Sequence, residues 1–286
     1  SNRNWKIKTN LGIYVLKWMN YCDDNNFKQY MNWLTKLLLI ENYPIMLNES
    51  TNAKEQVLLY EGHFCQLHKY IFGRNLVLGN KSDCQESFSY LAKLHNILQC
   101  EKQYMPEFEY WKKNASHKLK QIETIYNNYF NACDVKKIIK DYDALIDKLY
   151  SEKCFSNKYF STIIHGDYHG ENILFDNSNK LTTILDWDTS RIGPRVYDVA
   201  KSLYLLCRKQ HNSFHIENKL FEFCMEYYSQ NSRISLSLEE VKIIPLILSI
   251  NYIPRLEYLQ SFEKKIKKLR WYLDWTYRAS QGVKEV

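Results

Sequence analysis

The sequence lacks an apolar run long enough to cross a membrane. Its longest strongly apolar stretch, Ile243 to Ile253, is interrupted by Pro245, Ser249 and Asn251, whereas a transmembrane helix needs about 20 apolar residues. No signal peptide opens the printed chain. We therefore expect a soluble protein with no membrane partner.

The sequence also lacks closely spaced cysteines. Its eight cysteines are scattered, with no Cys-x-x-Cys pair, over positions 22, 65, 84, 100, 133, 154, 207 and 224. Such scatter is typical of free thiols in a reducing compartment and argues against both a disulfide framework and a zinc site. The expected location is cytoplasmic.

No internal repeat or low-complexity linker divides the 286 residues, whose composition, 45% hydrophobic and 25% charged, is that of a globular protein. One large domain or two lobes is expected. The formal charge of +7 raises the question of nucleic acid, but the cations are spread along the chain. The one dense run, Lys264 to Arg270, interleaves with Ile266 and Leu269 at helical spacing. This favours a solvated helix face, and we expect no nucleic-acid partner.

The first part of the chain reads as strands around one helix. Apolar and alternating residues flank the Asn10-Leu11-Gly12 turn and predict a β-hairpin from Trp5 to Met19. A helix follows from about Phe27 to Glu41, with an apolar face at helical spacing. A second hairpin is expected from Gln56 to Ile71 around Glu61-Gly62. This order predicts a small α+β lobe.

After Gly73 the pattern changes to helical apolar spacing. The predicted segments are 82–99, 108–130, 135–150, 201–208, 219–230 and 238–273. The exception is Ile163 to Trp187, where two short strands, Ile173 to Phe175 and Leu181 to Leu185, flank a polar turn. The second lobe is therefore expected to be mainly helical with one short hairpin.

Polar residues are densest around that hairpin. Asp167 and Asn172 lie five residues apart in a glycine-punctuated loop that leads into a strand, and Asp186 and Asp188 follow the next strand. A loop carboxylate can orient a substrate hydroxyl and take its proton, while an amide oxygen and a second carboxylate can hold Mg²⁺ against phosphates. The pattern therefore favours phosphoryl transfer.

These residues resemble the aminoglycoside phosphotransferase and choline kinase superfamily, whose hallmark is HGDxHxxN followed by a hydrophobic strand and DxD. The similarity continues through Ile192 to Ala200, the Tyr14 to Lys17 strand, the Tyr70 to Gly73 hinge and the Leu91 to His95 helix. The chain is most similar to the bacterial spore-coat-associated branch in its motifs GDYHxxN, ILDWD and GPRxYD. This similarity implies that the protein could be spore-associated as well as cytoplasmic. The resemblance implies a protein-kinase-like α+β fold with two lobes.

The resemblance implies roles for individual residues. Asp167 would be the catalytic aspartate, and Asn172 and Asp186 would hold Mg²⁺. Lys17 would contact the α- and β-phosphates of ATP, and the backbone of Lys69 to Ile71 would hydrogen-bond adenine.

Four further residues receive supporting roles. The resemblance makes Asp188 and His169 candidates for backing the metal ligands or facing the substrate, and makes His165 and Asp198 structural supports of the catalytic loop. From its position, Asp198 could also cap a helix that begins near Val199. A zinc site at the two histidines is disfavoured, because the glycines between and after them oppose the helix that such a pair needs.

Two departures from the family pattern stand out. No Asp or Glu occurs from Asn25 to Ile40, so a neutral Gln29 or Asn32 would face Lys17 where the family has a glutamate, and would hold it less firmly. The small lobe is also expected to have an earlier strand and a phosphate-covering turn before Trp5.

The leading hypothesis is an ATP- and Mg²⁺-dependent phosphotransferase that phosphorylates an aminoglycoside, choline, sugar or related alcohol. Residues 1–71 would form the nucleotide-binding lobe and residues 72–286 the catalytic and acceptor-binding lobe. The alternative is a pseudokinase or a spore-coat interaction protein. The aromatic stretch from Trp271 to Tyr277 is assigned to helix packing, with a choline-binding cage as the minority interpretation.

Overall fold

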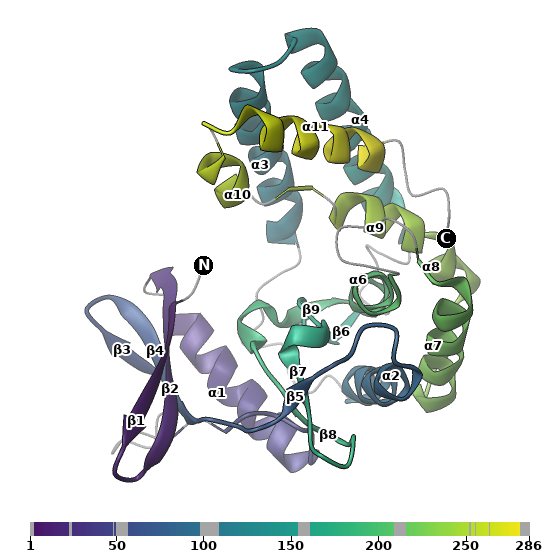
Figure 1. The fold of residues 1–286 in the computed structure, drawn as a ribbon. Coiled ribbons are helices and arrows are strands. Elements are labelled where there is room, and N and C mark those ends of the chain that lie inside the picture. Colours follow the sequence, from purple (N-terminus) through teal and green to yellow (C-terminus); the bar gives the residue numbers. More distant parts are fainter. Residues whose placement is uncertain are drawn as a thin grey trace.

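The computed structural model describes residues 3–22, 25–47, 49, 57–97, 109–153, 161–208, 216–251, 253, 254, 256–262 and 264–280. Figure 1 shows strands gathered beside helix α1 and a larger, mainly helical region. The strands are β1 (Arg3–Thr9), β2 (Gly12–Cys22), β3 (Leu58–Tyr60), β4 (His63–Lys69), β5 (Arg74–Asn75), β6 (Ser161–Ile164), β7 (Ile173–Phe175), β8 (Leu181–Ile184) and β9 (Arg191–Pro194). The helices are α1 (Asn25–Ile40), α2 (Lys81–Asn96), α3 (Glu109–Asn127), α4 (Ala132–Ser151), α6 (Arg195–Cys207), α7 (Asn218–Asn231), α8 (Leu238–Lys242), α9 (Ile244–Asn251), α10 (Leu256–Ser261) and α11 (Ile266–Ser280).

A four-stranded antiparallel sheet in the order β1-β2-β4-β3 forms the smaller part. Its first hairpin closes with Thr9 opposite Gly12, and the Leu11 N–H donates to the Thr9 hydroxyl over 3.1 Å. Both hairpins and the helix between them confirm the sequence prediction. The second prediction began at Gln56, which lies outside the described residues.

Side chains alternate across this sheet, and this alternation places Lys17 on its inner face. Lys17 and Met19 of β2 stand opposite Gln66 and Phe64 of β4, and all four are buried. The apolar stripe of α1, including Leu34, packs with Met19 and Phe64 in the core. A lysine is thereby held on the covered side of the sheet.

Two small sheets lie within the helical part. The β7–β8 hairpin was predicted, and β5 adds to its edge in the order β5-β7-β8. The other sheet pairs β6 with β9, with Ile163 opposite Ile192, and was not predicted. Together they confirm an α+β fold with a small antiparallel sheet and a larger, mainly helical region.

The helical predictions need two corrections. The segment 238–273 is not one helix but forms α8, α9, α10 and the start of α11, because Pro245 and Pro254 supply no N–H for a continuous helix. Helix α6 begins at Arg195, earlier than the predicted Lys201. None of the helices within the described ranges is long and apolar enough to traverse a bilayer.

Candidate active site

The loop from His165 to Gly170, which precedes Asn172, is tied to α6 by a buried carboxylate. Asp198 accepts the backbone N–H of His165 over 2.5 Å and that of Gly166 over 2.8 Å. Its position in the first turn of α6, where the N-cap is Pro194, corrects the prediction that it caps a helix near Val199. Asp198 is fully buried and acts on the loop backbone.

Gly166 is required where this loop turns. Its φ is +79°, and a Cβ atom there would lie 2.5 Å from the Thr189 carbonyl oxygen and 2.7 Å from Arg191 Nη1. The left-handed backbone disfavours other L-residues, and the close approach excludes any side chain unless the neighbours move. Gly166 thus lets the chain reverse tightly immediately before Asp167.

The ring of His165 has a defined tautomer. Its Nε2 lies 2.9 Å from the Leu185 carbonyl oxygen, which only accepts, and its Nδ1 lies 3.2 Å from the Asp167 backbone N–H, which only donates. The ring is therefore neutral, with its proton on Nε2. Burial lowers the pKa of His165 and outweighs the opposing effect of nearby acids such as Asp198. This histidine supports the loop through hydrogen bonds without carrying charge.

The backbone of Leu185 joins the two halves of the site. Its carbonyl oxygen accepts from His165, and its N–H donates to the Asn172 carbonyl oxygen over 2.8 Å. Asp186 is the next residue, so the carboxylate at the end of β8 and the amide at the start of β7 are held in register. The sequence placed these two groups at adjacent strand ends, and these hydrogen bonds bring them together.

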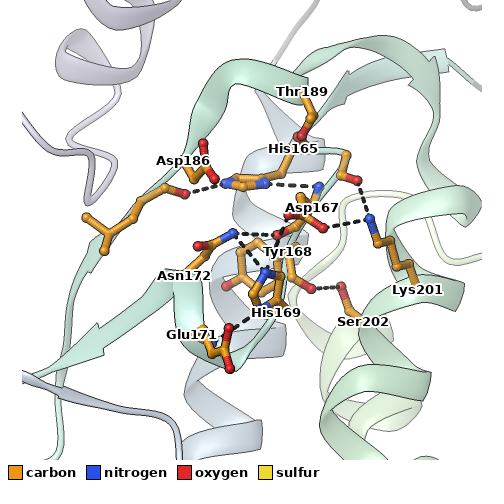
Figure 2. A network of polar contacts seen from close by, with 12 residues as sticks. His165, Asp167, Tyr168, His169, Glu171, Asn172, Asp186, Thr189, Lys201 and Ser202 are labelled. Carbon is orange, nitrogen blue, oxygen red and sulfur yellow. Dashed lines mark hydrogen bonds and ion pairs between the residues drawn. The ribbon is translucent and has the colours of Figure 1, made fainter. Parts of the chain in front are cut away.

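Asp167 lies at the centre of the polar network in Figure 2. Its Oδ1 is 2.7 Å from Lys201 Nζ, and its Oδ2 is 3.4 Å from His169 Nε2. Asn172 Nδ2 donates to the Asp167 carbonyl oxygen over 3.0 Å, so the Asn172 amide oxygen is the end that can bind a cation.

The carboxylate of Asp167 is held in its charged form. Burial acts to raise its pKa, but the hydrogen bond from His169 and the charge of Lys201 outweigh burial and place the pKa well below its usual range. For Lys201, burial acts to lower the pKa, but nearby Tyr197 and Asp167 raise it overall. At neutral pH the two residues form an ion pair.

Lys17 reaches across from the small sheet to both carboxylates after β8. Its Nζ is 2.6 Å from Asp186 Oδ1 and 2.7 Å from Asp188 Oδ2. Burial acts to lower the pKa of Lys17, and the two aspartates more than offset it, so the pKa is raised. Asp186 adopts a left-handed backbone with φ of 61° and keeps its side chain 43% exposed, whereas the Asp188 side chain is only 3% exposed.

The expected neutral partner of Lys17 on α1 is not found there. The α1 residues that line the cleft beside Lys17 are Met31, Leu34 and Thr35, while Gln29 is exposed. Helical geometry turns Gln29 away from this face. Asn32, the other candidate, is half-buried, and its Oδ1 accepts no hydrogen bond from the described residues. Lys17 is held by the two aspartates, which corrects the expectation of a loosely held lysine.

The hinge segment follows β4. The Tyr70 N–H donates to the Ile13 carbonyl oxygen over 2.8 Å, which anchors the hinge to β2. The Lys69 carbonyl oxygen lies 3.2 Å from His68 Nδ1, and the Lys69 side chain is exposed and 3.7 Å from Glu49. Ile71 is half-buried. Lys69 is thus the last residue of β4, and Ile71 lies just beyond the end of this strand, in the segment that leaves the sheet containing Lys17.

The donor atoms at the site suit a hard cation. The Asn172 amide oxygen and the exposed Asp186 carboxylate are oxygen ligands of the kind that Mg²⁺ prefers, and Mg²⁺ retains several waters. Across the described ranges, no three His, Cys, Asp or Glu side chains form a cluster that could hold a metal. His169 Nδ1 lies 3.3 Å from the Glu171 N–H, and His165 is committed to Leu185 and Asp167. The ring nitrogens of both histidines thus face hydrogen-bond partners within the protein.

The aromatic residues of α11 pack against one another. The rings of Trp271 and Trp275 stack with centroids 5.3 Å apart and planes at 25°, and Trp275 is buried. Near-parallel stacked rings occupy each other's faces, which favours packing over a cation cage.

Sequence reasoning did not identify Lys201 as a site residue. The residues around it in α6, including Ala200, Ser202 and Leu203, are buried. A single lysine in such a run, three residues after Asp198, was the available signal. Its partner is distant in sequence, so only the fold shows where the ammonium goes.

This fold and site define the class of the protein, which is a protein-kinase-like phosphotransferase. Lys17 of the small sheet lies beside a group formed by Asp167, Asn172 and Asp186. The chain belongs to the phosphotransferase enzyme family, whose sequence profile matches residues 1–219. A search of curated proteins finds no significant match.

Three solved structures that share this fold are kinases or phosphotransferases that act on small molecules. A microcompartment-associated aminopropanol kinase superposes with a TM-score of 0.74 at 13% identity, covering 98% of this chain and 89% of the other. A spectinomycin phosphotransferase bound to ADP and spectinomycin gives 0.67 at 13% identity, covering 100% and 90%. The choline kinase LicA from Streptococcus pneumoniae gives 0.61 at 15% identity, covering 99% and 90%.

Proposed function

We propose that this protein transfers the γ-phosphate of ATP, with Mg²⁺, to a hydroxyl group of a small molecule. One observation carries the proposal: a continuous set of contacts runs from Lys17 through Asp186 and the Leu185 backbone to Asn172 and Asp167. A cation, an oxygen ligand pair and a charged loop carboxylate are thereby placed in one site. Phosphoryl transfer needs these groups, because positioning and charge neutralisation supply most of its rate.

The proposed roles follow from the contacts. Asn172 and Asp186 would hold Mg²⁺, which would neutralise the phosphate charge. Lys17 would turn its ammonium from the two aspartates to the α- and β-phosphates, and Asp167 would orient the acceptor hydroxyl and accept its proton. The backbone of Lys69 to Ile71 would bind adenine.

Two supporting groups complete the proposed site. His165 and Asp198 would fix the catalytic loop, since their hydrogen bonds engage its backbone. Asp188 would back the metal site through Lys17, and His169 would face the acceptor beside Asp167.

We also propose a boundary after residue 71. Beyond the hinge, β5 pairs with β7, so the chain from residue 72 onward joins the part that carries the catalytic loop. Residues 1–71 would bind nucleotide, and residues 72–286 would bind the acceptor and carry catalysis. Motifs such as GPRVYD support the spore-coat-associated branch, and the free thiols of Cys65, Cys84, Cys133, Cys207 and Cys224 support a reducing, cytoplasmic location.

The acceptor would be an alcohol such as an aminoglycoside, choline, ethanolamine, aminopropanol or a sugar. The test measures Mg²⁺-dependent ATP consumption with such a panel and detects the phosphorylated product by its mass. Asp167→Asn keeps the side chain's shape and should lower kcat by roughly 10²- to 10⁴-fold, the usual worth of a positioned acid or base. Asp134→Asn, at an exposed site in the first turn of α4, is the matched control and should remain active.

A second candidate is a nucleotide-binding protein without turnover. The absence of acidic residues from α1, combined with an ion pair between Lys17 and the would-be metal ligand Asp186, favours this alternative. It predicts that wild type and Asp167→Asn bind an ATP analogue equally and that neither transfers phosphate to any acceptor in the panel.

A further inference from the structure

We propose that Lys201 is a positioning residue for phosphoryl transfer, which holds one carboxylate oxygen of Asp167 and presents the other to the acceptor hydroxyl. The inference rests on the proposed function and adds a residue from α6 to it. Lys201 would act through Asp167 without touching either substrate.

The geometry of the ammonium supports this role. Lys201 Nζ donates to Asp167 Oδ1 over 2.7 Å and to the Gly166 carbonyl oxygen over 2.8 Å (Figure 2). One donor group thus spans the side chain of the catalytic residue and the backbone immediately before it. Two contacts on adjacent residues fix the rotation of the Asp167 side chain more tightly than either contact alone.

The two carboxylate oxygens of Asp167 have different hydrogen-bond partners. Oδ1 accepts a short, charge-assisted hydrogen bond from Lys201, whereas Oδ2 has only the longer, weaker hydrogen bond of 3.4 Å from His169 Nε2 and keeps capacity to accept another. Oδ2 is therefore the oxygen that can accept a hydrogen bond from an incoming hydroxyl. The Asp167 side chain is 16% exposed, which permits that approach.

Lys201 is itself held firmly. Its side chain is only 20% exposed, and its neighbour Ser202 donates to the Tyr168 carbonyl oxygen over 3.2 Å. Tyr168 in turn donates its hydroxyl to the Ser87 carbonyl oxygen of α2 over 2.8 Å. Helix α6 thus contacts three successive residues of the catalytic loop from one side, which makes it a rigid base for the ammonium.

The test compares three substitutions. Lys201→Met keeps the stem that packs on α6 but removes the ammonium, Lys201→Arg keeps the charge and the donors, and Lys219→Met in the exposed first turn of α7 is the matched control. Magnesium-ATP turnover is measured with water and with the acceptor panel, and the affinity for AMP-PNP is measured separately. Thermal unfolding of each variant establishes that it is folded.

We expect kcat to fall roughly 100-fold in Lys201→Met, comparable to the effect of a 1 Å misplacement of a catalytic group, while AMP-PNP affinity and the KM for ATP stay unchanged. Lys201→Arg should recover much of the loss. In the Asp167→Asn background, Lys201→Met should have no further effect, because Lys201 acts through the carboxylate.

Three results would overturn the inference. If Lys201→Met turns over as fast as wild type, or loses nucleotide affinity in proportion to its activity, Lys201 does not position Asp167, although the proposed function stands. If Lys201→Met does not fold, Lys201→Arg provides the test instead. A folded Lys201→Arg variant that has lost all activity would exclude a role for charge at this position. If wild type transfers no phosphate even to water, the proposed function and this inference fail together.

Discussion

Replacing Gly166 with alanine should lower the unfolding free energy in two ways, through backbone strain and through a steric clash of the new Cβ atom. The φ of +79° costs a non-glycine residue about 1–2 kcal/mol. The added Cβ would lie 2.5 Å from the Thr189 carbonyl oxygen, and accommodating such overpacking costs typically about 1–3 kcal/mol. The two costs together predict a loss of about 2–5 kcal/mol of unfolding free energy. At about 2 °C per kcal/mol for a chain of this size, Tm should fall by roughly 4–10 °C.

Gly62 supplies the matched control. Its φ is +74°, but no heavy atom lies within 4 Å of the position that its Cβ would take. Gly62→Ala should therefore lose unfolding free energy only through backbone strain, about 1–2 kcal/mol, and should lower Tm by roughly 2–4 °C. The difference between the two variants measures the close approach at the catalytic loop.

Urea and thermal unfolding check the stabilities, and magnesium-ATP turnover checks the function. Because Gly166 precedes Asp167, the shift that relieves the contact should also lower turnover by roughly 100-fold, whereas Gly62→Ala should remain active. If Gly166→Ala and Gly62→Ala lose the same unfolding free energy, the close approach of the Thr189 carbonyl oxygen to Gly166 carries no steric cost, and the reasoning is refuted. Full activity of Gly166→Ala would show that Asp167 does not depend on this turn.

The remaining predictions concern charged residues. Lys17→Met should weaken binding of an ATP analogue, measured by isothermal titration, because it removes the ammonium that is proposed to contact the phosphates, and unchanged affinity would exclude that contact. The variant should also lose unfolding free energy, because the buried Asp188 carboxylate loses the Lys17 ammonium. Arg195→Ala should cost about 3–5 kcal/mol in urea unfolding, because it leaves the fully buried Glu240 carboxylate without its cationic partner; a loss below 1 kcal/mol would contradict this. Burial acts to raise the pKa of Asp198, but His95, His165 and the Gly166 N–H outweigh it and hold the pKa low. Its contribution to stability is thus present above the unfolded pKa of about 4 and is lost as pH falls below it. Wild type should lose more unfolding free energy than Asp198→Asn between pH 5 and 3, and parallel losses would count against the assignment.

Much of the architecture was predictable because local patterns encode it. The turn at Asn10-Leu11-Gly12 and the alternation on either side of it specified a hairpin that β1 and β2 form. The polar loop from Asp167 to Asn172, followed by a strand and Asp186, indicates phosphoryl-transfer chemistry from sequence alone. These signals lie within a few residues of one another, so steric and hydrogen-bonding rules apply to them directly.

Other features depended on contacts between distant segments. The β6–β9 pair joins two strands of four residues each, too short to show a convincing alternation. The contact of Asp198 with the backbone of His165 and Gly166, and the partner of Lys201, follow from how α6 packs against that loop. A helical pattern predicts which residues are buried, but it does not say which loop they meet.

By itself, the sequence indicated the family, the first hairpins and helix, and the Asp and Asn side chains grouped near β7 and β8, because each of these signals lies in contiguous residues. Only the tertiary structure decided that Lys17 pairs with Asp186, which is 169 positions away, and that Lys201 donates to Asp167. The physical reason is that an ion pair's partner is chosen by proximity after folding, and folding brings together side chains that share no local pattern.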